Sequence, residues 1–358
     1  MRIPHTRPYY FTTTLWLTVA LLFLLLFSGT DCKKNPIVPP GPDTTSHNFS
    51  FTQYVFGGQG GSSYFKDCAI VSDTEIWAVG AIYTDSGFFN AARWNGKVWE
   101  LERIPQNLYN DNCSLAGSAY GTLQTVFAFN DGNVILTSGG DFILWNGSSF
   151  SHLPCPNSAA NTGISKLWGI NENDFYAVGA TGTIIHYFNT AWTKLASGTT
   201  LDIYDIYGSG GEILAVASQV GSSFDRAILS IQGTTVTKVA DTPIAYPLQG
   251  IWFVQGKHYY VVGSGIYEKE KLTDSAWADS VLEFTQYYTT SVRGNATNDV
   301  FVAGSFGELL HWNGTTWKSF RDQTAISNGG YGRNAVKENL VVAVGEDAPR
   351  GVIVVGRR

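Results

Sequence analysis

Short apolar runs alternate with polar, glycine-rich turns along most of the chain, and one phrase of this pattern recurs. The phrase begins at an acidic or Asn turn and continues through four or five apolar residues to a glycine. A second apolar strand, an Asn-Gly pair and an aromatic residue follow. Clear copies occupy 75–101, 173–195 and 298–320, and weaker copies occupy 133–153, 212–239, 258–281 and 339–358. Short runs bounded by turn residues predict strands, so the chain is expected to be all-β.

The glycine that ends the first apolar run of each copy marks the period. This position is Gly80, Gly139, Gly179, Ala217, Gly263, Gly304 and Gly345. A period of about 40 residues with four short strands per unit is typical of a propeller blade. A further apolar stretch before each phrase supplies an innermost strand, as at 166–170, 203–208, 248–254 and 290–295. The repeats therefore predict a single β-propeller with seven four-stranded blades.

The two ends of the repeat region are expected to share one blade. The last copy stops at Arg358 directly after its third strand, while the apolar segment 49–56 precedes the first copy and has no other partner. An N-terminal strand that completes the last blade would leave no long open edge. Residues 57–61 (GGQGG) then link this closing strand to the first blade.

The turns between the third and fourth strands carry a recurrent signal. Asn95-Gly96, Asn146-Gly147 and Asn313-Gly314 predict type I′ turns, which favour Asn-Gly. We expect the aromatic residue after each pair to pack between blades. These residues are Trp99, Phe150 and Trp317, with Trp192 in the third unit.

The copy at 298–320 resembles repeats of secreted bacterial propellers related to photosystem II stability factors and to sialidase-type (Asp-box) propellers. The resemblance covers 60–358 and implies the fold. The Asp box, Ser-x-Asp-x-Gly-x-Thr-Trp, is not intact, because residues 311–317 (HWNGTTW) keep its Gly-Thr-Thr-Trp end without the Ser and Asp. The arginine cluster, tyrosine nucleophile and acid of a sialidase cannot be matched, so the resemblance does not imply that activity.

The N-terminal residues have the pattern of an export signal. Basic residues precede the apolar run 15–27, which is shorter than the roughly 20 residues that span a bilayer but fits a signal peptide. The following Cys32 resembles the lipid-acceptor cysteine of bacterial lipoproteins, although Asp31 replaces the usual small residue. We expect a lipoprotein signal peptide at 1–31, lipidated Cys32 with a Pro-rich tether at 32–48, and the propeller at 49–358. A plain signal peptide or an uncleaved anchor are the alternatives.

This resemblance implies a location at the bacterial cell envelope, with the membrane contacted through the lipid anchor only. Lys33 after the cysteine favours the outer membrane. The net charge of −6 and the scattered Lys and Arg residues argue against a nucleic-acid partner, which requires a basic patch. We expect a monomer.

Three cysteines remain after Cys32. Cys113 and Cys155 lie in expected loops and could form a disulfide in an export compartment. Cys68 lies inside an apolar strand and is expected to be a buried thiol. No cysteine or histidine spacing matches a metal site, and we expect neither a metal nor a cofactor.

No catalytic motif is present, and we nominate no catalytic residue. His186 and His311 occupy the same third-strand position in two copies, which indicates a structural role. The acidic segments 72–75, 171–174 and 295–299 fall where each blade needs its first turn. Turn formation explains them better than calcium binding, which needs a fuller pattern of Asp residues.

Two long connections in the first unit are candidates for a binding site. Segments 82–91 and 105–122 correspond to a B–C loop and a D–A connection, which emerge on the same face of a propeller when strands are lettered A to D from the axis. Aromatic, Asn and Asp side chains on such loops suit a sugar or peptide ligand. The candidate residues are Tyr83, Asp85, Phe88, Phe89, Tyr109, Asn110, Asp111 and Asn112, with Tyr120 beside them. Alternatively, these loops pack on themselves, tied by a Cys113–Cys155 bridge.

Polar residues of the innermost strands are expected to face the central channel. The candidates are Asp67, Lys166, Asp205 and Arg293, and solvation of the channel would explain them without a ligand. The leading functional hypothesis is a non-enzymatic binding or scaffold propeller that recognises an envelope protein. A carbohydrate-binding propeller is the second hypothesis, and a glycan-active enzyme is the third.

Overall fold

The computed structural model describes residues 43–156, 163–219, 224–279 and 283–358. The expected signal peptide (1–31), Cys32 and most of the tether lie outside this part of the chain and stay predictions. Among the described residues, no helix is long and apolar enough to span a membrane.

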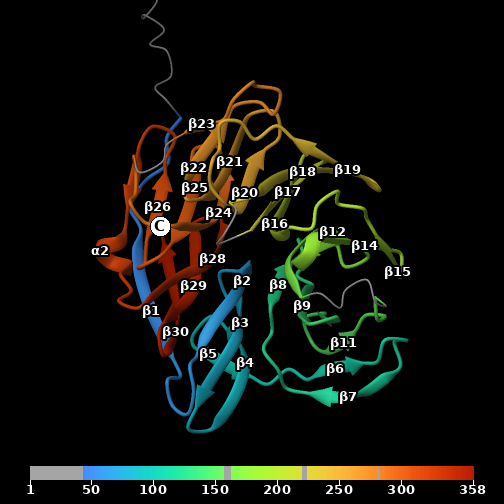
Figure 1. The fold of residues 1–358 in the computed structure, drawn as a ribbon. Helices are drawn as coiled ribbons and strands as arrows, with labels where there is room; N and C mark the ends of the chain where they lie inside the picture. Colours follow the sequence, from blue (N-terminus) through green and yellow to red (C-terminus); the bar gives the residue numbers. More distant parts are fainter. Residues whose placement is uncertain (1–42, 157–162, 220–223, 280–282) are drawn as a thin grey trace, which may run out of the picture. The chain divides into compact units, whose positions relative to one another are not determined.

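Seven four-stranded antiparallel sheets form the blades of a β-propeller, as the repeats predict. Six blades use consecutive strands, ordered from the axis outward (Figure 1). Blade 1 comprises β2 (Tyr64–Ser72), β3 (Glu75–Thr84), β4 (Gly87–Trp94) and β5 (Trp99–Glu102); blade 2, β8 (Thr125–Ala128), β9 (Val134–Ser138), β10 (Asp141–Trp145) and β11 (Phe150–His152); blade 3, β12 (Ile164–Asn171), β13 (Asp174–Gly179), β14 (Thr183–Phe188) and β15 (Ala191–Lys194).

Blade 4 comprises β16 (Asp202–Ser209), β17 (Glu212–Ser218), β18 (Arg226–Gln232) and β19 (Thr235–Val239); blade 5, β20 (Leu248–Val254), β21 (His258–Gly263), β22 (Gly265–Lys269) and β23 (Ala278–Asp279); blade 6, β24 (Thr289–Ala296), β25 (Asp299–Gly304), β26 (Leu309–Trp312) and β27 (Trp317–Ser319). Blade 7 comprises β28 (Gly329–Lys337), β29 (Leu340–Asp347), β30 (Arg350–Arg357) and β1 (Ser50–Phe56). A hairpin of β6 (Gln106–Tyr109) and β7 (Leu115–Ala119) lies outside the blades, and the short helices are η2 (Ala180–Gly182) and α2 (Arg321–Thr324).

The apolar side chains that close the ring lie between blades. The seven innermost strands contact one another in sequence, and β28 of blade 7 contacts β2 of blade 1. Each of seven buried clusters in the described chain joins two neighbouring blades. Burial between blades is therefore what makes the repeat necessary, because one sheet cannot cover both of its apolar faces.

The expected closure by the N-terminal strand is confirmed. β1 pairs with β30 from Ser50–Arg357 to Phe56–Gly351 in an unbroken antiparallel register. Figure 1 shows β1, in blue, beside the red β30. Phe49 is buried against Phe301 and Phe320 of blade 6, so the closing strand also contributes to the contact between blades 6 and 7.

The glycine that marks the repeat has a steric explanation. A Cβ atom built at Gly80 would collide with the carbonyl oxygen of Tyr64, and one at Gly345 would collide with the carbonyl oxygen of Gly330. Both oxygens belong to the start of the innermost strand, which approaches closely because it contains a β-bulge there. The recurrent glycine therefore permits this close approach.

Six of the seven innermost strands contain this bulge. Each has one residue more than its partner strand, which bends the strand and turns side chains at that end of the channel. The six extra residues are Lys66, Ser165, Tyr204, Gln249, Thr290 and Gly332.

The predicted type I′ geometry of the Asn-Gly turns is wrong. That turn needs positive φ at both central residues, but only the glycine has it, as at Gly96 (φ +90°). The Asn95 Oδ1 atom instead accepts hydrogen bonds from the backbone N–H groups of Lys97 and Val98, both at 3.0 Å. Asn146 and Asn313 make the same side-chain turn. Asn is therefore selected as an acceptor here.

The expected packing of the aromatic residues after these turns is confirmed. Trp99 contacts Tyr54 and Phe56 of blade 7, and Phe150 contacts Trp77 of blade 1. Trp192 contacts Phe142 of blade 2, and Trp317 contacts Tyr260 of blade 5. Each aromatic residue thus fills space against the preceding blade.

Candidate functional site

The candidate segment 105–122 folds as a separate hairpin between blades 1 and 2. Its strands β6 and β7 pair with each other from Gln106–Ala119 to Tyr109–Leu115, with a shift of register between Leu108 and Tyr109. A disulfide joins Cys113 at its turn to Cys155 after the last strand of blade 2. The possible bridge of the sequence analysis is therefore present in the structure, and Cys68 is the buried free thiol.

A buried carboxylate also holds this hairpin. The backbone N–H of Asn107 donates to Asp141 Oδ2 at 2.7 Å, and the His152 Nδ1 atom lies 3.0 Å from both Asp141 oxygens. Burial raises the pKa of Asp141, while its hydrogen bonds to His152 and Asn107 act in the opposite direction. Since both oxygens are engaged, this carboxylate positions the hairpin.

The hairpin presents apolar side chains to solvent. Leu108 is 45% exposed, Leu115 62% and Tyr120 57%. Strand β7 carries no charged residue (Leu115–Ala119, LAGSA), although charges commonly protect exposed strands from pairing with other chains. A rigid, stapled element with exposed leucines is suited to contact with another molecule.

Three of the predicted ligand-binding residues meet in one cleft. Tyr109, Asn110 and Asp111 line a space of about 230 Å³ between the hairpin and the B–C turn of blade 2. Gln106 lines the same cleft, and its Oε1 atom is buried without a hydrogen-bond partner among the described residues. Asn112 accepts hydrogen bonds from Ser114 and so shapes the hairpin turn.

The other predicted residues lie elsewhere on the first blade, and the expected loop 82–91 is mostly strand. The ladder of β3 and β4 continues to Thr84–Gly87 beyond a bulge, so Asp85 lies in a tight turn. The Tyr83 and Phe88 rings pack 5.2 Å apart, and the Arg103 guanidinium lies 4.7 Å from the Phe89 ring. None of these residues lines the cleft below the hairpin.

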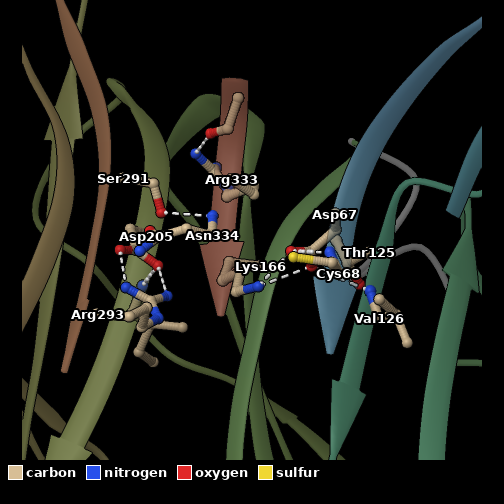
Figure 2. A network of polar contacts seen from close by, with 12 residues as sticks. Asp67, Cys68, Thr125, Val126, Lys166, Asp205, Ser291, Arg293, Arg333 and Asn334 are labelled. Carbon is tan, nitrogen blue, oxygen red and sulfur yellow. Dashed lines mark hydrogen bonds and ion pairs between the residues drawn. The ribbon is translucent and has the colours of Figure 1, made fainter. Parts of the chain in front are cut away.

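The four polar channel candidates do lie on innermost strands, but the expectation that solvation explains them is wrong. Lys166 of blade 3 donates to both carboxylate oxygens of Asp67 of blade 1, at 2.6 and 2.7 Å (Figure 2). Both side chains are buried. The Asp67 oxygens also accept the backbone N–H groups of Cys68 and of Val126 in blade 2. One carboxylate therefore joins three blades.

The same arrangement recurs on the opposite side of the channel. Asp205 of blade 4 accepts a bidentate ion pair from Arg293 of blade 6, at 2.7 and 2.8 Å. It also accepts the backbone N–H groups of Ile206 and of Ile251 in blade 5. Burial alone would raise the pKa of Asp205, but Arg293 and the other channel cations hold it below its ordinary value.

Sequence reasoning missed a third cation of the channel. The Arg333 guanidinium donates to the backbone oxygens of Tyr204, Thr290 and Gly332, and so reaches from blade 7 to blade 4. Arg333 directly follows a bulged residue, as Asp67, Lys166 and Asp205 do. Aligning the innermost strands on that position would have found it.

The repeated histidines are paired with carboxylates, which supports the structural interpretation. His186 Nε2 lies 2.8 Å from Asp174 Oδ1, and His311 Nε2 lies 2.9 Å from Asp299 Oδ1. The acidic segments at 72–75, 171–174 and 295–299 all span the turn between the first two strands of a blade. Within the described ranges, no group of three His, Cys, Asp or Glu side chains is placed to hold a metal ion.

The fold and this face define the class of protein as a seven-bladed β-propeller with an inserted, disulfide-tied hairpin. No protein-family model matches the sequence, and no curated protein matches it.

Solved structures with the same fold are numerous. YCF48 bound to a D1 peptide has a TM-score of 0.64 at 14% identity, covering 89% of this chain and 100% of that chain. A catalytically inactive virginiamycin B lyase from Staphylococcus aureus, with quinupristin, has a TM-score of 0.63 at 10% identity, covering 86% and 100%. The WD40 propeller of Doa1 has a TM-score of 0.57 at 11% identity, covering 87% and 98%. At these identities the likeness shows the fold alone, in agreement with the resemblance to photosystem II stability factors.

Proposed function

We propose that the chain is a non-enzymatic propeller, anchored at the bacterial cell envelope through lipidated Cys32, that binds a protein partner with its β6–β7 hairpin. The observation that carries this proposal is the exposure of Leu108, Leu115 and Tyr120 on an element fixed by a disulfide and a buried carboxylate. Preorganised apolar side chains bind without the entropic cost of ordering a loop. One of the structures with this fold is itself bound to a peptide, which supports a polypeptide partner.

Site-specific crosslinking tests the partner. A photo-reactive residue replaces Leu115 in one variant of the full chain and Val98 in a second, matched variant. Each variant is expressed in the native cells. Val98 is 56% exposed on a turn between third and fourth strands, at the opposite face. We expect a discrete adduct from position 115 that contains a second polypeptide. Equal adducts from both positions, or none, would contradict binding by the hairpin.

The anchor is tested separately. Lipidated proteins fractionate with membranes, and the acyl chain is attached through one cysteine. We expect Cys32→Ser to abolish incorporation of labelled palmitate and to release the chain from the outer-membrane fraction. A substituted chain that still fractionates with the membrane would show that the apolar run 15–27 or the propeller itself holds it there.

A carbohydrate ligand is the second candidate. It is favoured by the Tyr83–Phe88 ring pair beside Asp85 at the tip of the β3–β4 hairpin, because sugars stack on aromatic faces and bond to carboxylates. The substitution Tyr83→Ala separates the two functions. It should abolish retention of an envelope glycan by the purified chain and leave the adduct at position 115 unchanged.

A further inference from the structure

The mouth of the central channel where the innermost strands begin lies on the same face as the hairpin. A cavity of about 560 Å³ lies between the beginnings of the innermost strands of blades 1, 5, 6 and 7. Four of the six bulged residues line it: Lys66, Gln249, Thr290 and Gly332. Bulges turn side chains out of the regular alternation and are frequent beside binding sites. The recurrent bulge of this propeller thus shapes one cavity.

Two cations at this cavity form no ion pair with a carboxylate of the described residues. In the described part of the chain, neither Lys66 nor Arg333 forms an ion pair. The Lys66 Nζ atom lies 5.1 Å from the centroid of the Tyr64 ring, and the Arg333 guanidinium donates to the backbone carbonyl oxygens of Tyr204, Thr290 and Gly332. Buried charges are ordinarily paired with an opposite charge, so a half-buried guanidinium without an ion pair, as at Arg333, is unusual.

The charges deeper in the channel do not compensate. Asp67 pairs with Lys166, and Asp205 pairs with Arg293, although Arg333 also helps to lower the pKa of Asp205. Among the described residues, Glu346 is the only acidic one that lines the cavity wall, against Lys66 and Arg333. The lining therefore carries a surplus positive charge, and the low-dielectric channel below it strengthens the field at the mouth.

The walls also leave room for a ligand. A Cβ atom built at Gly332 would meet nothing within 4 Å, so the backbone beside Arg333 is open. Gln249 adds an amide that can donate a hydrogen bond, and an arginine fork matches the geometry of a carboxylate.

We propose that the channel mouth binds a carboxylate group, held by Arg333 and Lys66 with Gln249 beside them. The proposal deepens the proposed function, because an acidic side chain of a partner bound at the hairpin could supply this group. A free small dicarboxylate has the same chemistry.

Calorimetric titration of the full chain in detergent with sodium succinate, at low ionic strength, tests the site without a partner. We expect Lys66→Met to weaken binding about two- to fivefold and Glu346→Gln to strengthen it by a similar factor, as for partly exposed charges. Arg333→Gln should weaken it more than tenfold. Lys97→Met, on a turn at the opposite face, is the matched control and should change nothing.

The opposite signs expected for Lys66 and Glu346 keep the test valid if the Arg333 variant does not fold. A second titration uses a capped peptide with two adjacent glutamates. Binding of succinate alone assigns a small metabolite, and tighter binding of the peptide assigns a partner's acidic segment. No binding of either at millimolar concentration, or equal weakening by Lys66→Met and Lys97→Met, would overturn the proposal. The crosslinking at position 115 does not depend on either result.

Discussion

The Nδ1 atom of His47, in the segment that leads into the closing strand, lies 2.8 Å from the Nδ1 atom of His311 in blade 6. Only one of the two facing atoms can carry a proton at this distance. The Nε2–H of His311 donates to Asp299. Burial alone would raise the pKa of Asp299, but its hydrogen bonds from His311, Arg358 and Asn295 hold that pKa below its ordinary value. The two histidines therefore cannot both be cationic while the segment stays docked.

This pair predicts that the fold loses stability as the pH falls below about 6.5, the ordinary pKa of histidine. Burial, His311 and Lys318 lower the pKa of His47 in the folded chain. Between that lowered pKa and 6.5, the unfolded chain binds more protons at His47, so acidification favours unfolding. Thermal melts from pH 7.5 to 5.0 should show a falling midpoint.

The contribution of His47 to this pH dependence can be isolated. His47→Asn should flatten the dependence, because it removes the titrating group, and Ser46→Ala at the exposed neighbouring position should not. An unchanged slope in His47→Asn would mean that another group controls the acid sensitivity.

The closing strand predicts a length dependence of stability. A chain that begins at residue 59 lacks β1 and its seven paired positions with β30, whereas a chain that begins at residue 43 keeps them. Each lost ladder hydrogen bond costs about 0.5–1.5 kcal/mol, so the shorter chain should melt at a clearly lower temperature by calorimetry. Equal melting temperatures would show that blade 7 is stable with three strands.

A single side chain of the same region gives a sharper test. Phe49 is buried against blade 6, so Phe49→Ala should cost about 3–5 kcal/mol of unfolding free energy. Val55, on the strand β1 that follows, is 53% exposed, and Val55→Ala should stay within about 0.5 kcal/mol. Denaturant titration measures both. Similar costs would mean that backbone pairing alone closes the ring.

The buried pair of Asp67 and Lys166 predicts a non-additive double-mutant cycle. Burial and the neighbouring cations Arg293 and Arg333 lower the pKa of Lys166, although Asp67 opposes them. Lys166→Met alone leaves a buried carboxylate without its cation and should cost about 3–5 kcal/mol. Asp67→Asn combined with Lys166→Met should cost less than Lys166→Met, because no unpaired charge remains. A double variant less stable than both singles would contradict this expectation, because each residue would then stabilise the fold independently of the other.

The sequence predicted the blades because their signals are local. The recurrent glycine and the Asn-Gly turns reflect contacts within one blade, between strands that follow one another. The closure by segment 49–56 was also accessible, because counting strands left one blade incomplete and one strand without a partner.

The cross-channel contacts could not be predicted in the same way. Asp67 meets Lys166 two blades later, and Arg333 meets the Tyr204 carbonyl of a distant blade. Such partners depend on the bulges that set the register of six innermost strands, and the recurrent glycine that faces a bulge does not specify which blades meet across the channel. The sequence likewise predicts a loop at 82–91, although the β3–β4 ladder continues beyond a bulge to Thr84–Gly87.

The disulfide gives the last prediction, which concerns the hairpin that the proposed function uses. Replacing Cys113 and Cys155 by serine should cost about 2–4 kcal/mol, as for loops of this size. Hydrogen exchange measured by mass spectrometry should accelerate in peptides covering 106–119 before it does in the blades, because the bridge and the Asn107–Asp141 bond fix the hairpin. The unsubstituted chain, with its disulfide intact, is the control. If 106–119 exchanges equally in both forms, Asp141 holds the hairpin without the bridge, and Asp141→Asn should then release it.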